Sequence, residues 1–472
     1  MVFSSAIFLF VFLPIFLSIY YLTPYRFRSP VILAGSYIFY AWWRVDFLFL
    51  FAIVTFLTYL LSLYIERAED IRRKKQLLTL GVVANLLTLA YFKYFNFGVA
   101  ALNDLIVNMG GQPMSAWSVI LPIGVSFYIF HCISYLADVY RGDAEVADTY
   151  WDFAAFTALF PHLIAGPVLR YKDLAWQFRT RTHSWDKFNE GVLRFGVGFA
   201  KKVLIADTVA PLADAMFALP DPTFTESWIG ILSYAIQLYF DFSGYSDMAV
   251  GLALMMGFRF IENFDNPYIS TSITEFWRRW HISLSTWLRD YLYIPLGGNK
   301  KGRIRTYINL MTTMTLGGLW HGANWTFILW GAWHGLILSI ERMLGGKNKN
   351  PYPRLIALPL TFVFVLVGWV LFRSHDLQAA FAIYHGMSGL NGWALTDRAL
   401  WQINPFELTT LGIAYILVFA SPFIIRKIDE KGFPAIAARM PLAGQLACNG
   451  LFAVAIIKMI AQSFSPFLYF QF

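Results

Sequence analysis

Two histidines between residues 277 and 325 are the strongest candidates for chemistry in this chain. His281 ends the Trp-Arg-Arg-Trp-His stretch that begins at Trp277, and His321 follows forty residues later, inside Gly317–Trp325. The surrounding sequence is largely apolar, and a charge at the centre of a membrane helix costs about 2.5–3.5 kcal/mol on insertion scales. Because an imidazole exchanges protons near neutral pH, the two histidines predict acid–base chemistry inside a membrane protein.

His321 has the more informative surroundings. Gly317 and Gly318 precede it and permit the close approach of another backbone or a ligand. On a continuous helix Asn324, three residues on, shares the face of His321. The Trp-His-Gly triplet recurs at His334, but 13 residues turn a helix by about 220°, so His334 points elsewhere and ranks second. We therefore predict that His321 is catalytic.

Two interpretations of His281 remain open. Its tryptophan and arginine neighbours suit the headgroup layer of a membrane, which would make the residue interfacial. Alternatively, His281 lines a cavity and positions or polarises a substrate. The basic turn at 297–305 is similarly open: it is either an attractor for an anionic donor or an ordinary positive loop.

The segment Tyr239–Asp247 holds two carboxylates, two serines and a glycine between long apolar flanks. It is either a helix break, in which the serines satisfy freed carbonyls, or a polar cavity wall that includes Asp241. Pro161 and Pro167 each lack a backbone donor, so residues 161–170 cannot form one undisturbed helix. Broken backbone at membrane depth is tolerated where protein or a water-filled cavity satisfies it, which predicts a cavity.

Composition sets the class of fold. Of the 472 residues 58% are hydrophobic and 14% are charged, against about 25% charged in soluble domains. Apolar runs of about 20 residues, enough to cross a membrane, recur along the chain. We predict an all-α polytopic membrane protein with roughly ten to twelve membrane segments, some of them re-entrant. The expected spans are 2–23, 30–43, 46–64, 77–92, 118–137, 152–168, 192–216, 227–256, 307–344 as two, 354–373, 407–425 and 443–465.

We interpret the chain as one membrane domain, because no internal repeat or low-complexity linker divides it. Residues 1–115 form a scaffold, residues 120–345 the catalytic core, and residues 350–472 the C-terminal helices. The basic loop Glu66–Lys75 is expected in the cytoplasm, which places the N-terminus outside. The net charge of +8 is spread over short loops, so no nucleic-acid partner is expected. The spacing of histidines and of Cys132 and Cys448 predicts no metal site.

Several of these segments resemble the membrane-bound O-acyltransferase family, most closely its bacterial branch that O-acetylates alginate. The similarity lies in Trp277–Asp290 and Gly317–Trp325, and extends to Tyr40–Asp46, His162–Pro167, Tyr239–Asp247 and the C-terminus. The resemblance implies an essential histidine at His321 in a narrow central tunnel, with His281 nearby. It also implies transfer of an acyl group from a cytoplasmic thioester towards the outer face of the bacterial inner membrane.

The last six residues, Phe467–Phe472, resemble an aromatic C-terminal motif of polysaccharide acylation systems, in which a tyrosine is proposed to carry the acyl group. Tyr469 takes that place here, and a phenyl ester keeps much of the transfer potential of a thioester. The alternative is an aromatic belt at the membrane interface. The residues expected to bind substrate are Arg289, Asp290, Asn324, Trp320 and Asp241.

The predicted function is O-acetylation of an exopolysaccharide such as alginate, with acetyl-CoA as the acyl donor and no bound cofactor. His321 is expected to act as general base and His281 to orient or polarise the donor carbonyl. A periplasmic acetyltransferase or SGNH-like partner would pass the acetyl group to the polymer, and membrane lipid surrounds the protein. Arg426–Pro441 is shorter than in some alginate-type members, so cellulose and peptidoglycan remain alternatives. A more remote alternative is a proton-coupled transporter.

Overall fold

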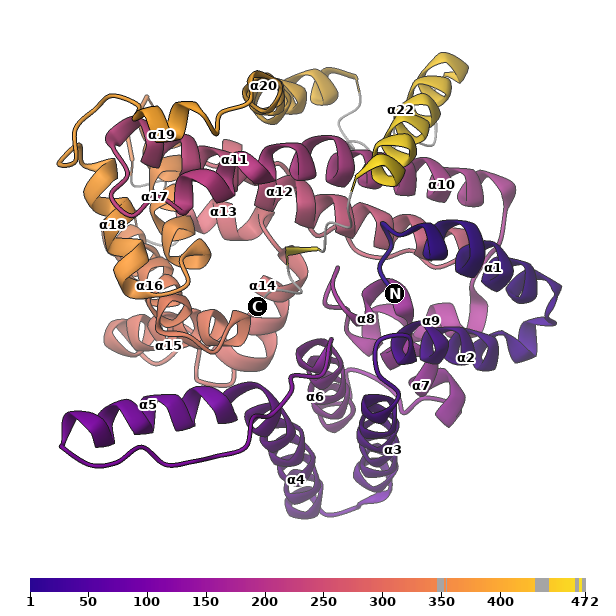
Figure 1. Ribbon diagram of the computed structural model, residues 1–472. Helices are drawn as coiled ribbons and strands as arrows, with labels where there is room; N and C mark the ends of the chain where they lie inside the picture. Colours follow the sequence, from indigo (N-terminus) through magenta and orange to yellow (C-terminus); the bar gives the residue numbers. More distant parts are fainter. Residues whose placement is uncertain (346–351, 354, 429–440, 463–466, 469–472) are drawn as a thin grey trace. The chain divides into compact units, whose positions relative to one another are not determined.

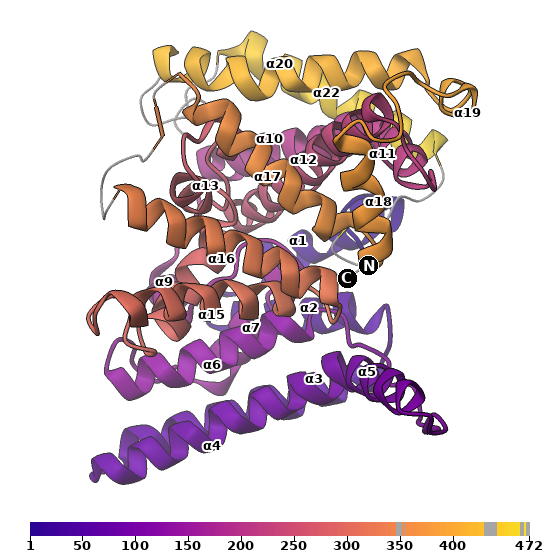
Figure 2. The same cartoon turned by 90° about the vertical axis from the view of Figure 1, so that its left-hand side faces the viewer.

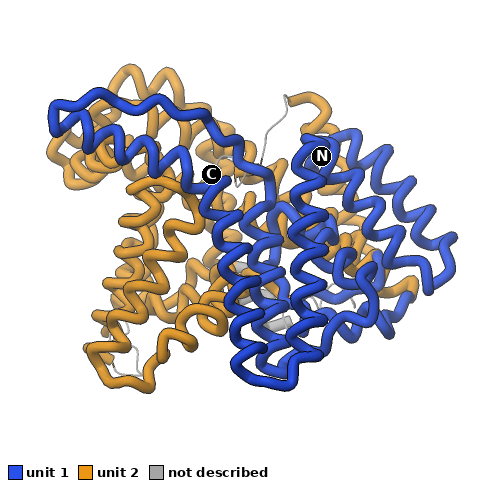
Figure 3. Tube along the Cα trace, turned by 90° about the horizontal axis from the view of Figure 1, so that it is seen from below, with its two compact units in different colours: residues 1–183, 256–260 blue, residues 184–255, 261–472 orange. Residues whose placement is uncertain are grey.

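The computed structural model describes residues 1–472 apart from 346–351, 354, 429–440, 463–466 and 469–472. Throughout the described residues the regular structure is helical, without a strand (Figure 1). They form two compact units, shown in separate colours in Figure 3. Unit 1 comprises residues 1–183 and 256–260, and unit 2 comprises 184–255 and 261–472. The prediction of an all-helical chain is confirmed, and the division into scaffold, core and C-terminal helices stays a prediction.

Three helical stretches in the described part are long and apolar enough to cross a membrane: Asp46–Arg67, Ile71–Asn108 and Leu442–Ala461. Shorter apolar helices cover Phe8–Leu22, Ala357–Arg373 and Pro405–Ala420. Their outward side chains are large and hydrophobic, as on Phe49 and Ile457, which are 66% and 67% exposed. Exposed apolar surface of this extent is typical of helices that face lipid.

Unit 1 has nine α-helices in the described residues, and aromatic rings make up much of its interior. The ring of Phe160 packs against those of Phe12, Phe16 and Phe39, with centroids 5.2–5.5 Å apart. The helices are α1 (Leu13–Leu22), α2 (Arg28–Ala41), α3 (Asp46–Arg67), α4 (Ile71–Leu89), α5 (Phe95–Asn108), α6 (Val125–Arg141), α7 (Tyr150–Ala158), α8 (Phe160–Leu163) and α9 (Tyr171–Thr180).

Of three expectations for unit 1, one is confirmed and two differ from the structure. The helix expected from residue 118 begins only at Val125, because Gly124 lies in the left-handed region with φ +74° and prevents an earlier start. The expected break between Pro161 and Pro167 is confirmed, since α8 ends at Leu163 and no helix resumes before Tyr171. The basic residues 72–75 belong to the first turns of α4 instead of a loop.

Unit 2 contains the long α12, which packs along α10 and α11, and the antiparallel pair α15 and α16, which lie side by side in Figures 1 and 2. The helices of unit 2 are α10 (Trp185–Ala200), α11 (Asp207–Phe217), α12 (Phe224–Met255), α13 (Ile273–Arg279), α14 (Ile282–Leu288), α15 (Arg303–His321), α16 (Trp325–Gly345), α17 (Ala357–Arg373), α18 (Leu377–Met387), α19 (Asp397–Leu400), α20 (Pro405–Ile428) and α22 (Leu442–Ala461).

Two pairs of glycines bring α10 and α12 into backbone contact. A Cβ on Gly191 would lie 2.7 Å from the carbonyl oxygen of Gly251, and one on Gly198 would lie 2.5 Å from that of Gly244. The two pairs are seven residues apart on each helix, so the same faces of α10 and α12 meet twice along the contact. Small residues at such a crossing are how helices pack closely within a membrane.

The polar segment Tyr239–Asp247 does not interrupt α12, which is helical from Phe224 to Met255. The interpretation of this segment as a helix break is therefore wrong. Its carboxylates are satisfied by charged side chains from the neighbouring helix instead, as described below. Immediately after α10, residues Lys201–Ala206 form a π-helical segment, a feature that often occurs at functional sites.

Glycines also join α15 to α16. A Cβ on Gly318 would lie 2.2 Å from the carbonyl oxygen of Phe327, and one on Gly331 would lie 2.3 Å from that of Met314. The close approach expected from the glycines before His321 is therefore confirmed. Helix α15 ends at His321, because Gly322 is extended with φ −156° and ψ +146°.

Candidate active site

His281 and His321 lie close together inside unit 2. Their ring centroids are 6.5 Å apart and the rings are tilted by 60°. His281 is 0% exposed and His321 is 6% exposed. The interfacial interpretation of His281 is wrong, because its ring is enclosed by protein.

The backbone of His281 is unusual. The residue stands between α13 and α14 with φ +44° and ψ +53°, a left-handed conformation that few residues other than glycine adopt. Asn266 is the other non-glycine residue in the described part with a positive φ. Such conformations cost on the order of 1–3 kcal/mol and cluster at functional sites. The turn aims the imidazole of His281 into the interior instead of along the helix that follows.

Asn263 holds the ring of His281 in place. Its Oδ1 lies 3.1 Å from Nδ1 of His281 and accepts hydrogen bonds from the hydroxyl and the backbone N–H of Ser283. Its Nδ2 donates to the hydroxyl of Ser246 on α12, at 3.2 Å. A backbone N–H can only donate, so Asn263 must present its oxygen to this side.

This arrangement determines the tautomer of His281. Since Oδ1 of Asn263 only accepts, Nδ1 of His281 carries the hydrogen, and the neutral ring has its lone pair on Nε2. Nε2 is buried and has no hydrogen-bond partner among the residues that the structure describes. A buried acceptor without a partner is costly, so this nitrogen is available to a ligand that brings a hydroxyl or another donor.

His321 is surrounded by aromatic rings. Ring centroids lie 4.9 Å away for Trp320, 5.1 Å for Trp330 and 5.3 Å for Phe372, all edge-on. Phe242 of α12 closes the site from the side of His281, with its ring 4.8 Å from the imidazole and perpendicular to it. The two imidazoles therefore share surroundings of low polarity, in which electrostatic interactions are stronger than in water.

His334 lies on α16, which begins after the break at residues 322–324, so the continuous helix assumed for its orientation does not exist. Its Nδ1 accepts a hydrogen bond from the indole of Trp277 at 3.3 Å, and it is 0% exposed. The ring of Trp330 contacts those of both His321 and His334. His334 is a core histidine with an indole as its partner.

Asp241 belongs to a buried charged cluster. Nζ of Lys202, in the π-helical segment, lies 2.9 Å from Oδ1 of Asp241 and 2.6 Å from Oδ1 of Asp207. The second oxygen of Asp241 accepts a hydrogen bond from the backbone N–H of Leu468, at 2.9 Å. Leu468, close to the C-terminus, therefore lies against α12. Tyr469 lies outside the described residues.

One helical turn and a half further along α12, Asp247 forms a second buried cluster. Its carboxylate contacts the guanidinium of Arg194 and Nζ of Lys201, each at 2.6 Å. Arg194 also pairs with Glu262 at 2.6 Å. Glu262 precedes Asn263 in the chain, so this cluster fixes the segment that supports His281.

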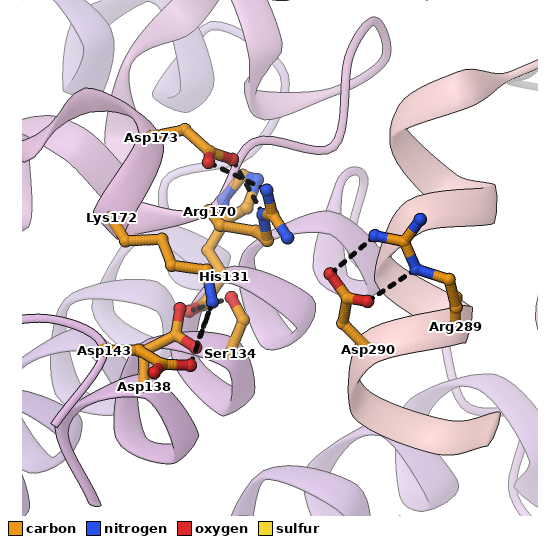
Figure 4. Close-up of polar contacts among 9 residues, drawn as sticks. All are labelled: His131, Ser134, Asp138, Asp143, Arg170, Lys172, Asp173, Arg289 and Asp290. Carbon is orange, nitrogen blue, oxygen red and sulfur yellow. Dashed lines mark hydrogen bonds and ion pairs between the residues drawn. The ribbon is translucent and has the colours of Figure 1, made fainter. Parts of the chain in front are cut away.

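The remaining predicted substrate-binding residues have different partners. Arg289 and Asp290 pair with each other at 2.7 Å (Figure 4), and the side chain of Arg289 is 60% exposed. Asn324 does not continue the face of His321; its amide donates to the carbonyl of His375 at 2.7 Å and its oxygen caps Thr326. Trp320 is 4% exposed and contacts His321 with its ring.

Unit 1 has a histidine pair of its own. The rings of His131 and His162 are 4.6 Å apart, and Nε2 of His162 lies 2.9 Å from the carbonyl of Phe156. About two turns of α6 beyond His131, Asp138 pairs with Lys172 at 2.9 Å (Figure 4). His162 is therefore a core histidine that is hydrogen-bonded to a backbone carbonyl.

A pocket of about 590 Å³ opens in unit 2 where α11 and α17 end and α18 begins. Arg373 crosses it to reach Asp214 at 2.5 Å. Arg373 directly follows Phe372, whose ring contacts His321. Two neighbouring residues of α17 thus link the pocket to the histidine: Arg373 lines the pocket and Phe372 contacts His321.

Asn263, Lys202 and Phe242 are the residues of this site that the sequence did not single out for chemistry. An asparagine after an acidic residue has no spacing that connects it to a histidine 18 residues later. The signal for Lys202 was a pair of lysines in an apolar stretch, which becomes informative only when a carboxylate of another helix is known to face it.

Comparison with known proteins adds the family context. The sequence profile of MBOAT, the membrane-bound O-acyltransferase family, matches residues 36–373. A probable alginate O-acetylase of Azotobacter vinelandii is 53% identical over 499 residues, and one of Pseudomonas putida is 54% identical over 489 residues, each covering 100% of both chains. A peptidoglycan O-acetyltransferase of Helicobacter pylori is 33% identical over 521 residues, covering 100% of this chain and 98% of the relative.

Proposed function

The chain belongs to the membrane-bound O-acyltransferase family, and on this premise we propose that it is the membrane O-acetyltransferase that modifies an exopolysaccharide, alginate in the first instance. The observation that carries the proposal is the buried contact between His281 and His321. Relatives named as alginate O-acetylases, at 53% and 54% identity over the full chain, support the choice of polymer. Acetyl-CoA is the proposed donor.

In the proposed reaction His321 is the general base. It takes the proton of the acceptor hydroxyl while the hydroxyl oxygen attacks the carbonyl carbon of the thioester. The carbon–sulfur bond then breaks, and the proton passes from His321 to the sulfur of the departing CoA. An imidazole suits both proton transfers, because its unperturbed pKa of about 6.5 lies near the working pH.

The hydrogen bonds of His281 refine the role expected for it. Polarising a carbonyl requires a donor, whereas the neutral ring that Asn263 holds offers only an acceptor at Nε2. We therefore propose that His281 orients the acceptor hydroxyl by accepting its hydrogen bond, and that His321 removes the proton. Polarisation of the donor carbonyl by His281 would need a charged imidazolium, which an apolar pocket disfavours.

The donor is proposed to enter from the cytoplasm along α15. The basic turn at 297–305 lies at the start of this helix. Along α15, the 18 residues from Arg303 to His321 correspond to a rise of about 27 Å. The turn can therefore hold the phosphates of an extended acetyl-CoA but not its thioester. We propose that ten to twelve membrane segments of the inner membrane enclose a central tunnel to His321, with the N-terminus in the periplasm.

Tyr469 is the proposed first acceptor. Its phenol would take the acetyl group as an ester and pass it to a periplasmic partner of the acetyltransferase or SGNH type, which acetylates the polymer. Direct transfer to a partner or polymer is the alternative route. Peptidoglycan is the alternative polymer that a specific observation favours, since the relative of Helicobacter pylori is named for it; cellulose has no such support.

The experiment that tests this proposal follows labelled acetyl groups through the purified full-length protein in nanodiscs. The protein is incubated with radiolabelled acetyl-CoA, CoA release is timed, and labelled peptides are located by mass spectrometry. We expect label on Tyr469 and its loss in His321→Ala. Full CoA release by His321→Ala would contradict the assignment of the base, and unchanged polymer acetylation by Tyr469→Phe would eliminate the acyl-tyrosine step.

The polymer is identified in cells with the chromosomal copy deleted. Acetyl content is measured by NMR on purified alginate and on peptidoglycan, with wild-type protein and with His321→Ala restored at equal abundance. Acetylated alginate that depends on His321 supports the proposal. Acetylation confined to peptidoglycan would replace alginate as the acceptor and leave the chemistry of the histidine pair intact.

A further inference from the structure

Phe467 and Leu468, close to the C-terminus, lie against three residues of α12, Asp241, Phe242 and Tyr245, which we call the receptor. Phe467 is 3% exposed and its ring stacks on that of Tyr245, with centroids 4.5 Å apart and planes at 29°. The ring of Phe242 has its centroid 6.0 Å from that of Phe467. The next residue, Leu468, is 7% exposed and donates its backbone N–H to Asp241 at 2.9 Å.

Three residues of this receptor share one face of α12. Asp241, Phe242 and Tyr245 are spaced at i, i+1 and i+4, so the carboxylate and one ring stand one above the other on the helix. The carboxylate recognises a backbone donor, and the two rings recognise an aromatic side chain. The receptor therefore recognises the main chain of Leu468 and the side chain of Phe467.

The charges behind Asp241 hold its carboxylate ready for that donor. Lys202 bridges Asp241 and Asp207 with its ammonium, at 2.9 Å and 2.6 Å. The cluster carries one positive and two negative charges in a buried setting, so a further donor to Asp241 is favourable. The backbone N–H of Leu468 supplies it without adding a charge.

The same region also holds helix α22, from which the C-terminal segment departs. Nζ of Lys458 donates to the carbonyl of Val203 at 2.9 Å and contacts the hydroxyl of Thr208. Val203 lies in the π-helical segment, where the altered hydrogen-bond pattern leaves a carbonyl accessible. Lys458 therefore bonds the segment that carries Lys202, and Leu468 bonds Asp241, the partner of Lys202 on α12.

The receptor is one ring away from the histidine pair. Phe242 contacts Phe467 with one part of its ring and meets His281 at 4.8 Å, edge to face. The position of Phe242 thus depends on both the bound C-terminal segment and the imidazole. A segment that left the receptor would remove the stacking partner of Tyr245 and one wall of Phe242.

We propose that Asp241, Phe242 and Tyr245 form a receptor that docks the chain's own C-terminal segment beside His281, and that Asp241 is a positioning residue for acyl transfer. The proposal rests on the proposed function, because the docked segment leads into Tyr469. In this role Asp241 acts through the docked residues and not on the polymer or the donor. It acts by holding the main chain at Leu468, so that the segment stays at the site between turnovers.

The test compares two substitutions at one position in the full-length protein. Leu468→Pro removes the N–H that Asp241 accepts, while Leu468→Ala keeps it and loses only the side chain. We expect Leu468→Ala to transfer acetyl faster than Leu468→Pro, because it keeps the N–H that Asp241 accepts. We expect Leu468→Pro to lower kcat by about tenfold or more, with the KM for acetyl-CoA unchanged.

A second readout does not depend on activity. Amide exchange of peptides that contain Leu468 is measured by mass spectrometry in wild type, Leu468→Ala and Phe467→Ala. Slow exchange at 468 in the first two and fast exchange in Phe467→Ala support the receptor. Fast exchange at 468 in the wild type, or equal kcat for Leu468→Pro and Leu468→Ala, would overturn it. The acetyl-transfer assay of His321→Ala distinguishes failure of the receptor proposal from failure of the proposed function. Activity without His321 would refute the proposed function instead.

Discussion

The imidazoles of His281 and His321 meet at a ring-centroid distance of 6.5 Å, although they belong to different helices and forty residues separate them in the chain. One ends α15 and the other opens α14 in a left-handed turn. Their burial among aromatic rings leaves little water around either ring. The following predictions rest on this pair and on the residues that hold it.

Removal of either histidine should abolish most of the transfer activity. We expect His321→Ala and His281→Ala each to lower kcat by about 10²–10⁴, the usual worth of positioned acid–base groups. The double variant should be little worse than the more damaging single one, because groups that act on one proton are not additive.

The matched control for these variants is His385→Ala. His385 is an exposed histidine whose Nδ1 lies 2.7 Å from Oδ1 of Asn391. It does not belong to the group of rings around His321, which consists of Trp320, Trp330 and Phe372. Initial rates of CoA release on protein normalised by size-exclusion peak height provide the measurement. Strictly additive losses in the double variant would mean that the histidines act in separate steps.

The hydrogen bond from His281 to Asn263 should control the acid side of the pH–rate profile. Asn263→Asp places a carboxylate beside Nδ1 and favours the charged imidazolium, which has no lone pair on Nε2. Since the ring then gains its proton at a higher pH, activity should be lost earlier as the pH falls. The acid limb of kcat is expected to move to higher pH.

Asn263→Ala should lower kcat by about tenfold, because the ring loses the partner that fixes its tautomer. Asn391→Asp alters the exposed histidine–asparagine pair in the same way and serves as the control; it should leave the profile unchanged. Profiles are recorded between pH 5 and 9 at saturating acetyl-CoA. An unmoved acid limb in Asn263→Asp would remove His281 from the titrating step.

Close packing of α10 on α12 should make Gly244 intolerant of any side chain. A Cβ there lies 2.7 Å from the carbonyl oxygen of Gly198, a backbone atom that cannot move aside alone. We expect Gly244→Ala to destabilise unit 2 by about 1–3 kcal/mol, the usual cost of overpacking. The measurement is the melting temperature by fluorescence-detected size exclusion.

Gly412→Ala is the comparison for that experiment. Gly412 lies in α20 with open space where a Cβ would stand, and alanine favours the helix by up to about 1 kcal/mol. Its melting temperature should equal or exceed that of the wild type. If both variants melted alike, the glycine contacts between α10 and α12 would not contribute to stability.

Arg289 should affect donor binding and not stability. The side chain of Arg289 is 60% exposed in its pair with Asp290, and pairs formed at the surface contribute about 0–1 kcal/mol. If the guanidinium contacts the phosphates of acetyl-CoA, Arg289→Ala should raise the KM by about three- to tenfold while kcat and the melting temperature stay the same. Arg44→Ala, in a similarly exposed pair with Asp46, is the control. An unchanged KM would exclude Arg289 from the donor site.

The sequence by itself determined the class of the molecule and the residues that can do chemistry. Its apolar composition required helices, since backbone groups in a membrane must be satisfied within the segment. The glycines before His321 indicated close packing, and Pro161 and Pro167 indicated broken backbone, because both effects depend on local geometry alone. Resemblance to known acyltransferases then pointed to His321 and His281.

Only the tertiary structure decided which of these residues meet. It ended α15 at His321, which moved Asn324 onto a different backbone path, and it kept α12 helical through Asp241 and Asp247. It brought Asn263 to His281 and Leu468 to Asp241 across 18 and 227 residues. Sequence periodicity reports the face of one helix at a time, whereas partners for buried polar groups are supplied by whichever helix packs against that face.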